Sequence, residues 1–134
     1  MKFKDHIAEE RFDLMCNRAK ELALEMDEWS QANYNIELTI TATVSTRKED
    51  EALGRISDTH RTGRAFDIRT RDLPASFIAE FCAYFRKKYN KELGASFKQN
   101  PSLIVYKPHG SGPHIHVQLK RSYALKPGDM NVKE

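Results

Sequence analysis

Residues 114–119 constrain the fold most strongly, because polar and apolar side chains alternate along them. A period of two is that of a β-strand, on which successive side chains point to opposite faces. Ile115 and Val117 are therefore expected to face the core, whereas His114 and His116 lie side by side on the other face. Two histidines on one face of an apolar strand are hard to explain by packing, so we treat both as candidate functional residues.

A second group of such residues occurs earlier in the chain, where His60, Gly63 and Asp67 follow one another at short spacing. Gly63 leaves the backbone free to turn between the other two. Asp67 is flanked by apolar residues, where a carboxylate needs a partner such as a cation. Two imidazoles and a carboxylate are a common zinc ligand set, although manganese, cobalt and nickel also accept these ligands. A three-ligand site keeps a position open for the water that metallohydrolases use as nucleophile.

The rest of the chain alternates between helical and strand periodicity. Apolar residues spaced by three and four predict a helix over residues 5–30, and alternation predicts a strand over 36–44. Residues 45–59 form an expected charged loop. The further expected elements are strands at 65–70, 103–106 and 114–119 and a helix that begins at Leu73-Pro74 and ends at Gly94. This order predicts an α+β fold, a small antiparallel sheet with helices packed on one face.

Composition limits the class of protein. The 134 residues are expected to form one domain over 1–134, with a core over 5–120 and a loosely ordered tail over 121–134. Neither a membrane-length apolar stretch nor a signal peptide is recognisable, so we expect cytoplasmic synthesis and no membrane partner. Cys16 and Cys82 lie in apolar helical patterns and are predicted to be buried free thiols. The net charge of +3 selects no partner, and a nucleic-acid hydrolase is disfavoured because paired carboxylates for two metals are lacking.

The two histidine motifs closely resemble those of a zinc peptidase superfamily that comprises lysostaphin-type endopeptidases, D-Ala-D-Ala metallopeptidases and the hedgehog signalling domain. The most similar branch contains D-alanyl-D-alanine carboxypeptidases and phage L-alanyl-D-glutamate endopeptidases. The first family motif is Ser-x-His-x-x-Gly-x-Ala-x-Asp, and the second is His-x-His or Glu-x-x-His. The positions that match are His60, Gly63, Ala65, Asp67, His114 and His116. At the family's serine position this chain has Asp58, so Ser57 or Thr59 would have to supply the hydroxyl.

The resemblance implies a role for each candidate residue. It makes His60, Asp67 and His116 the zinc ligands, and it leaves His114 unligated, as a general base or a transition-state stabiliser. A neutral imidazole suits that role because it titrates close to neutral pH. Arg47 resembles the family arginine that follows a strand and binds the substrate carbonyl or the developing oxyanion. For Arg47 alone, a solvated charged loop is an equally good interpretation.

The activity implied by the resemblance is zinc-dependent hydrolysis of peptidoglycan stem peptides, at a bond that involves a D-amino acid. Carboxypeptidase and endopeptidase action both remain open. A phage or prophage endolysin released to the cell wall by a holin-type route is a setting that would suit the expected lack of a signal peptide and of a separate wall-binding domain. The alternative is a catalytically inactive metal-binding module of the same fold, retained for interaction. Peptidoglycan peptide is the expected partner, no nucleic-acid partner is expected, and the oligomeric state is left open.

Overall fold

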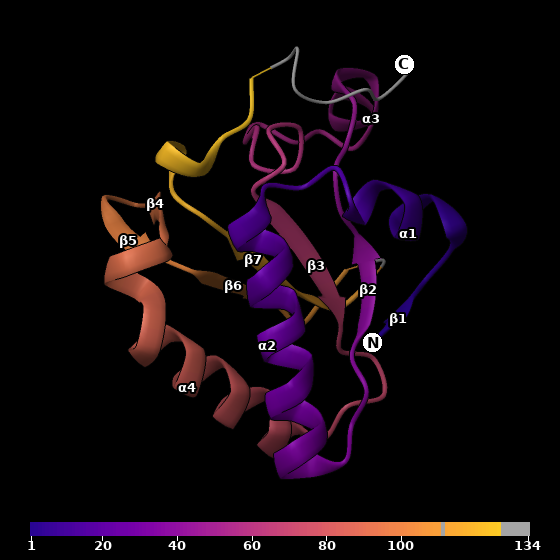
Figure 1. The fold of residues 1–134 in the computed structure, drawn as a ribbon, viewed down its shortest axis with the longest axis vertical. Coiled ribbons are helices and arrows are strands. Elements are labelled where there is room, and N and C mark those ends of the chain that lie inside the picture. The colour runs from indigo at the N-terminus through magenta and orange to yellow at the C-terminus, as the bar shows by residue number, and fades with distance from the viewer. Residues whose placement is uncertain (111, 127–134) are drawn as a thin grey trace.

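A computed structural model describes residues 1–110 and 112–126, which contain a five-stranded sheet (Figure 1). Its strands, in spatial order, are β1 (Lys2–Phe3), β2 (Thr39–Ala42), β3 (Ala65–Arg69), β7 (His114–Gln118) and β6 (Ile104–Lys107). All neighbours pair antiparallel except β1 and β2, which are parallel. The α+β class is confirmed, but the sheet is mixed rather than wholly antiparallel. The parallel strand β1 has only two residues, too few to produce a periodic pattern in the sequence.

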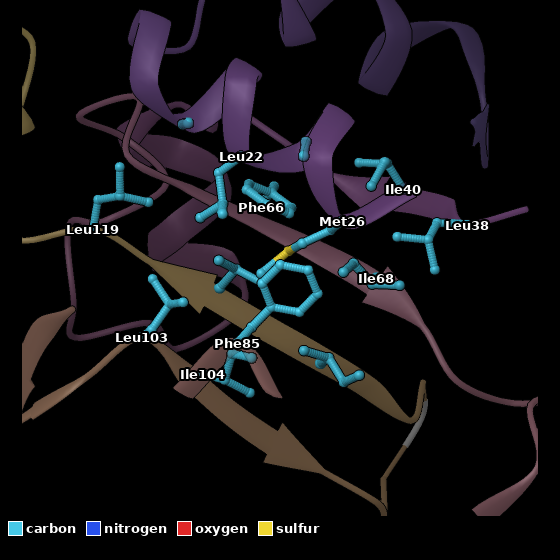
Figure 2. Packing of buried hydrophobic residues seen from close by; sticks show 14 of the residues in the cluster. Leu22, Met26, Leu38, Ile40, Phe66, Ile68, Phe85, Leu103, Ile104 and Leu119 are labelled. Atoms are coloured by element: carbon cyan, nitrogen blue, oxygen red, sulfur yellow. The ribbon is translucent and has the colours of Figure 1, made fainter. Parts of the chain in front are cut away.

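Two long helices, α2 (Asn17–Tyr34) and α4 (Ala75–Leu93), lie against one face of this sheet (Figure 1). Figure 2 shows Leu22 and Met26 of α2 and Phe85 of α4 packed over Phe66 and Ile68 of β3. All five side chains are fully buried. Burial of each such side chain contributes roughly 1.5–3 kcal/mol relative to exposure. The helices therefore use one face of the sheet for the core and leave the opposite face for other residues.

The prediction of one continuous helix over residues 5–30 is wrong. The structure has two helices in this range, α1 (His6–Phe12) and α2, which begins at Asn17. Between them Cys16 is extended, with ψ of 152°, and its N–H donates to the carbonyl oxygen of Gly63 at 2.8 Å. This long-range hydrogen bond replaces a helical one. The apolar spacing continues across the break, so periodicity could not reveal it.

The expected charged loop contains a short helix, α3 (Arg47–Ala52). Thr46 and Glu49 form a capping box, in which the Glu49 N–H donates to Thr46 Oγ1 (3.1 Å) and the Thr46 N–H donates to Glu49 Oε1 (2.8 Å). Arg11 of α1 also donates to Glu49 Oε1, at 2.6 Å. The threonine followed three residues later by glutamate is a known helix-start signal, and it could have located α3 from the sequence.

Helix α4 ends at Gly94, as predicted, but for a different reason from the usual left-handed cap. Gly94 has φ of −67°, which any residue can adopt. A Cβ atom at this position would lie 2.6 Å from the Asn90 carbonyl oxygen and 2.8 Å from the Leu103 nitrogen. Both atoms belong to the backbone and cannot easily move away. Gly94 is therefore required by the close approach of two chain segments.

A small hairpin that the sequence did not predict follows α4. Its strands are β4 (Ala95–Phe97) and β5 (Asn100–Ser102), which pair antiparallel. The two turn residues, Lys98 and Gln99, have φ of 50° and 68°. Tight hairpin turns with two left-handed residues usually carry Asn or Gly there. Lys-Gln gives no such signal, which explains why the hairpin was missed.

Residues 121–126 are held against the body of the protein, contrary to the loose order expected over 121–134. A short 3-10 helix, η1 (Arg121–Tyr123), begins this segment. The Leu125 N–H donates to the Thr62 carbonyl oxygen (2.8 Å), and the Tyr123 and Leu125 side chains pack on the core. Arg121 Nη1 lies 2.8 Å from Asp58 Oδ2. Residues 127–134 lie outside the described residues.

Cys16 and Cys82 are buried free thiols, as predicted. Among the helices described for residues 1–110 and 112–126, none has both the length and the apolar character needed to cross a membrane.

Candidate metal centre

The sheet face opposite the long helices carries the candidate ligands of β3 and β7. In this antiparallel pair Asp67 lies directly opposite His116, and Arg69 lies opposite His114. Phe66, the neighbour of Asp67, is fully buried in the core. Because side chains alternate, Asp67 points away from that core and toward the same face as His114 and His116. The expectation that the two histidines share one face is met.

His60 reaches the same place from the turn that precedes β3. Gly63 has φ of 69°, and its N–H donates to the His60 carbonyl oxygen at 3.1 Å. The His60 side chain is only 4% exposed. Its Nδ1 atom donates to the carbonyl oxygen of Thr43 (2.7 Å), and its Nε2 atom lies 3.2 Å from Asp67 Oδ1. The hydrogen bond to Thr43 therefore leaves the lone pair of Nε2 directed toward Asp67.

The three predicted ligands form a candidate metal-binding triad. His60, Asp67 and His116 each offer one ligand atom, and these atoms lie within 4.8 Å of one another. His116 Nδ1 is 2.9 Å from Asp67 Oδ1. A cation placed among two imidazole nitrogens and a carboxylate oxygen would have the ligand types that zinc and related metals prefer.

No family model, curated protein or solved structure matches the chain. The family resemblance therefore remains an expectation that rests on the two sequence motifs.

Charges within the triad favour cation binding. Burial raises the pKa of Asp67, but the adjacent His60 and His116 outweigh burial and hold that pKa well below its usual range. Burial lowers the pKa of His116, and this effect exceeds the opposing effect of the Asp67 carboxylate. An ionised carboxylate and a neutral imidazole are the forms that bind a metal ion. At neutral pH both ligands are therefore in the required protonation state.

His114 lies beside the triad and is more accessible than its members. Its Nδ1 atom donates to the Gly112 carbonyl oxygen (2.7 Å), and its Nε2 atom is 3.8 Å from Asp67 Oδ2. The side chain is 26% exposed, against 8% for Asp67. The hydrogen bond to Gly112 leaves the Nε2 lone pair free to accept a proton. This is the position that a general base next to a metal would occupy.

Gln118 is a residue of the site that the sequence analysis did not select. It is 6% exposed, and its Oε1 atom lies 3.1 Å from His116 Nε2. Its Nε2 atom donates to the Ser102 carbonyl oxygen (3.1 Å), which fixes the orientation of the amide. With the carboxamide oxygen beside Nε2, the ring nitrogen that a metal would take is Nδ1, in place of its present contact with Asp67 Oδ1. The signal was available, because Gln118 follows His114 and His116 at the same spacing of two.

Arg47 is exposed and is the first residue of α3. Among the described residues that line the groove beside His114 are Arg11, Arg55, Arg69 and Arg71, but not Arg47. The role that the resemblance implies for Arg47 therefore stays a prediction.

Asp58 stands at the position of the family's serine, and its contacts lie away from the triad. It pairs with Arg64 (2.9 Å) and with Arg121 (2.8 Å). The hydroxyl groups of Ser57 and Thr59, the two alternatives for that serine, contact each other at 3.3 Å. Asp58 thus connects the turn that carries His60 to the segment after β7.

Proposed function

We propose that this protein is a zinc-dependent peptidase that hydrolyses peptidoglycan stem peptides at a bond involving a D-amino acid. The observation that carries the proposal is the convergence of His60, Asp67 and His116, with the Nε2 atom of His114 next to them. The metal-dependent hydrolysis is supported by this arrangement. The choice of peptidoglycan as substrate is supported by the resemblance of the motifs.

The residues present fit a zinc ion. In zinc sites, a ligating histidine nearly always donates its second ring nitrogen to a carbonyl or carboxylate group. Here His60 donates Nδ1 to the Thr43 carbonyl oxygen, and His116 donates Nε2 to Gln118 Oε1. Both rings are therefore already oriented, each with one nitrogen available. A zinc ion held by this triad would supply Lewis acidity, which polarises a peptide carbonyl and lowers the pKa of a water molecule.

The remaining chemistry falls to residues around the triad. His114 Nε2 can take a proton from the attacking water, because its Nδ1 is already engaged with Gly112. The imidazolium formed would lie 3.8 Å from Asp67 Oδ2, whose negative charge stabilises it. The same proton can then be given to the leaving amine. Arg47 is proposed to bind the carbonyl oxygen of the scissile bond as negative charge develops on it.

The proposal is tested by metal analysis of the purified protein, together with digestion of bacterial peptidoglycan. We expect about one zinc ion per chain, as in mononuclear catalytic sites, and release of stem-peptide fragments. His114→Ala should retain zinc and lose cleavage. His109→Ala, which changes an exposed histidine of the linker before β7, is the matched control and should retain both.

Two results would contradict the proposal. Absence of bound metal after loading with zinc would contradict the metal centre itself. Zinc binding by a wild-type protein that cleaves no wall peptide would favour the alternative, a metal-binding module without hydrolytic activity.

A further inference from the structure

A groove of about 610 Å³ opens directly beside His114. Its walls come from the start of the chain through α1, from residues 41–45 in and after β2, and from α3 with the residues that follow it. The end of β3 and residues 112–114 at the start of β7 complete the lining. His114 itself lines the groove. A chemical group bound in the groove would therefore lie next to the proposed general base.

The groove is strongly basic. Its charged lining residues are Lys4, Arg11, Arg55, Arg69, Arg71, Asp5 and Glu49. Two of its arginines are already paired with carboxylates, Arg11 with Glu49 (2.6 Å) and Arg55 with Asp50 (3.1 Å). The other cationic side chains of the lining are those of Lys4, Arg69 and Arg71.

Arg69 and Arg71 are the two arginines among these three residues. Arg69 faces His114 across the β3–β7 pair, on the sheet face that carries Asp67. Within residues 1–110 and 112–126, the side chain of neither arginine makes a hydrogen bond or an ion pair. Two guanidinium groups in one groove repel each other, and an anion bound between them removes that repulsion. The planar fork of a guanidinium matches the two oxygens of a carboxylate in particular.

We infer that this groove is a carboxylate-binding subsite, in which Arg69 and Arg71 hold an acidic group of the substrate beside His114. The inference rests on the proposed function for the nature of the substrate. The binding of a carboxylate by the groove requires no metal, so the two ideas can be tested apart. Arg69 and Arg71 would act separately from Arg47, which is proposed to contact the scissile carbonyl.

The test uses metal-free protein, so that a metal cannot itself attract the probe. Acetyl-D-alanyl-D-alanine and its C-terminal amide are titrated into the protein, and binding is followed by backbone amide NMR signals around Thr41 and His114. We expect the free acid to bind at least about tenfold more tightly than the amide, which is the effect of one charge-assisted hydrogen bond. Arg69→Gln and Arg71→Gln should each reduce that preference. Lys87→Gln removes the same charge from an exposed position on α4 and should leave the preference unchanged.

Equal binding of acid and amide overturns the inference, and so does failure of both probes to bind. Loss of affinity for both probes alike in Arg69→Gln also overturns it, because the arginine would then have no specific carboxylate partner. The zinc-loaded protein separates the two proposals. Preference for the acid without cleavage of any peptide supports the subsite and contradicts the peptidase, whereas cleavage of acid and amide with equal kcat/KM supports the peptidase and contradicts the subsite.

Discussion

His116 Nδ1 lies 2.9 Å from Asp67 Oδ1, and the two residues are directly opposite each other in the antiparallel pair of β3 and β7. In the same pair Phe66 lies opposite Val117, and both are fully buried. A shift of one strand by one residue would turn its side chains to the opposite face. The register that packs Phe66 and Val117 in the core therefore also sets the distance between two candidate ligands. Core packing and site geometry depend on the same strand pairing.

Zinc should stabilise the folded protein through the triad. At free zinc about 100 times the dissociation constant, the free energy of unfolding should rise by about 2.7 kcal/mol. Asp67→Ala removes the only carboxylate of the triad, so thermal unfolding of this variant should respond little to zinc. His114→Ala leaves the triad intact and should retain the full shift in Tm. An equal zinc-induced shift in Asp67→Ala would place the binding site elsewhere.

Gln118→Leu should weaken zinc binding although Gln118 is not a ligand. The substitution removes the acceptor that orients the His116 ring, and loss of such a partner typically costs 10–100-fold in metal affinity. Zinc affinity is measured by competition with a chromophoric chelator. Gln31→Leu, which removes a glutamine that donates to Asp27 on α2, is the control and should leave zinc affinity unchanged. Unchanged affinity in Gln118→Leu would show that His116 needs no such support.

Arg47→Gln tests the role implied by the family resemblance. Loss of one donor to a developing oxyanion typically lowers kcat by about 10²–10³-fold. Because Arg47 is exposed at the first turn of α3, its replacement should change neither the zinc content nor Tm appreciably. Steady-state cleavage of a purified stem peptide gives kcat, and metal analysis gives the zinc content. Wild-type kcat in this variant would assign Arg47 to the solvated surface of α3.

Asp58→Asn should destabilise the protein in a pH-dependent way. Hydrogen bonds from Arg121 outweigh burial and hold the pKa of Asp58 below its ordinary value. The stabilising form is therefore the carboxylate, which is fully present above the unfolded pKa of about 3.9 and is lost as pH falls through the lower folded pKa. At pH 7 we expect a loss of about 2–3 kcal/mol, since the buried Arg64 also loses its counter-charge.

Urea unfolding at several pH values measures this effect. The difference between wild type and Asp58→Asn should narrow as pH falls from about 4 through the lower folded pKa, because in that range the unfolded wild-type chain binds a proton at Asp58 more readily than the folded protein does. Asp72→Asn, in an exposed turn, is expected to change stability by less than about 0.5 kcal/mol at any pH. A constant difference down to pH 2 would mean that Asp58 contributes through packing rather than charge.

Gly94→Ala should destabilise the protein by about 1–3 kcal/mol, although alanine is the better helix former. The added methyl group would meet two backbone atoms at less than 3 Å, as described above. Gly112→Ala is the matched control, since nothing lies within 4 Å of a Cβ atom there. Urea unfolding of both variants provides the comparison. A stabilised Gly94→Ala protein would show that the segments at Asn90 and Leu103 can move apart.

The strand positions that carry the candidate site could be predicted from the sequence alone. Alternation at residues 114–119 placed His114 and His116 on one face, and the short spacing of His60, Gly63 and Asp67 indicated the other candidate ligands, His60 and Asp67. These are local properties, because the direction of a side chain on a strand depends only on its position in the alternation. The buried thiols and the end of α4 at Gly94 were also predicted, each from the pattern around it.

The break in the first helix, the contacts that orient the candidate ligands and the basic groove depend on the tertiary structure. The break before α2 depends on a hydrogen bond between Cys16 and Gly63, which are far apart in the sequence and leave the apolar spacing undisturbed. The contact between His116 and Gln118 and the basic groove around Arg69 likewise depend on which elements meet in space. Hydrogen bonds and charges between distant segments leave no periodic trace in the chain. For that reason the candidate ligands could be proposed from the sequence, whereas the groups that orient their side chains and the groove beside them could not.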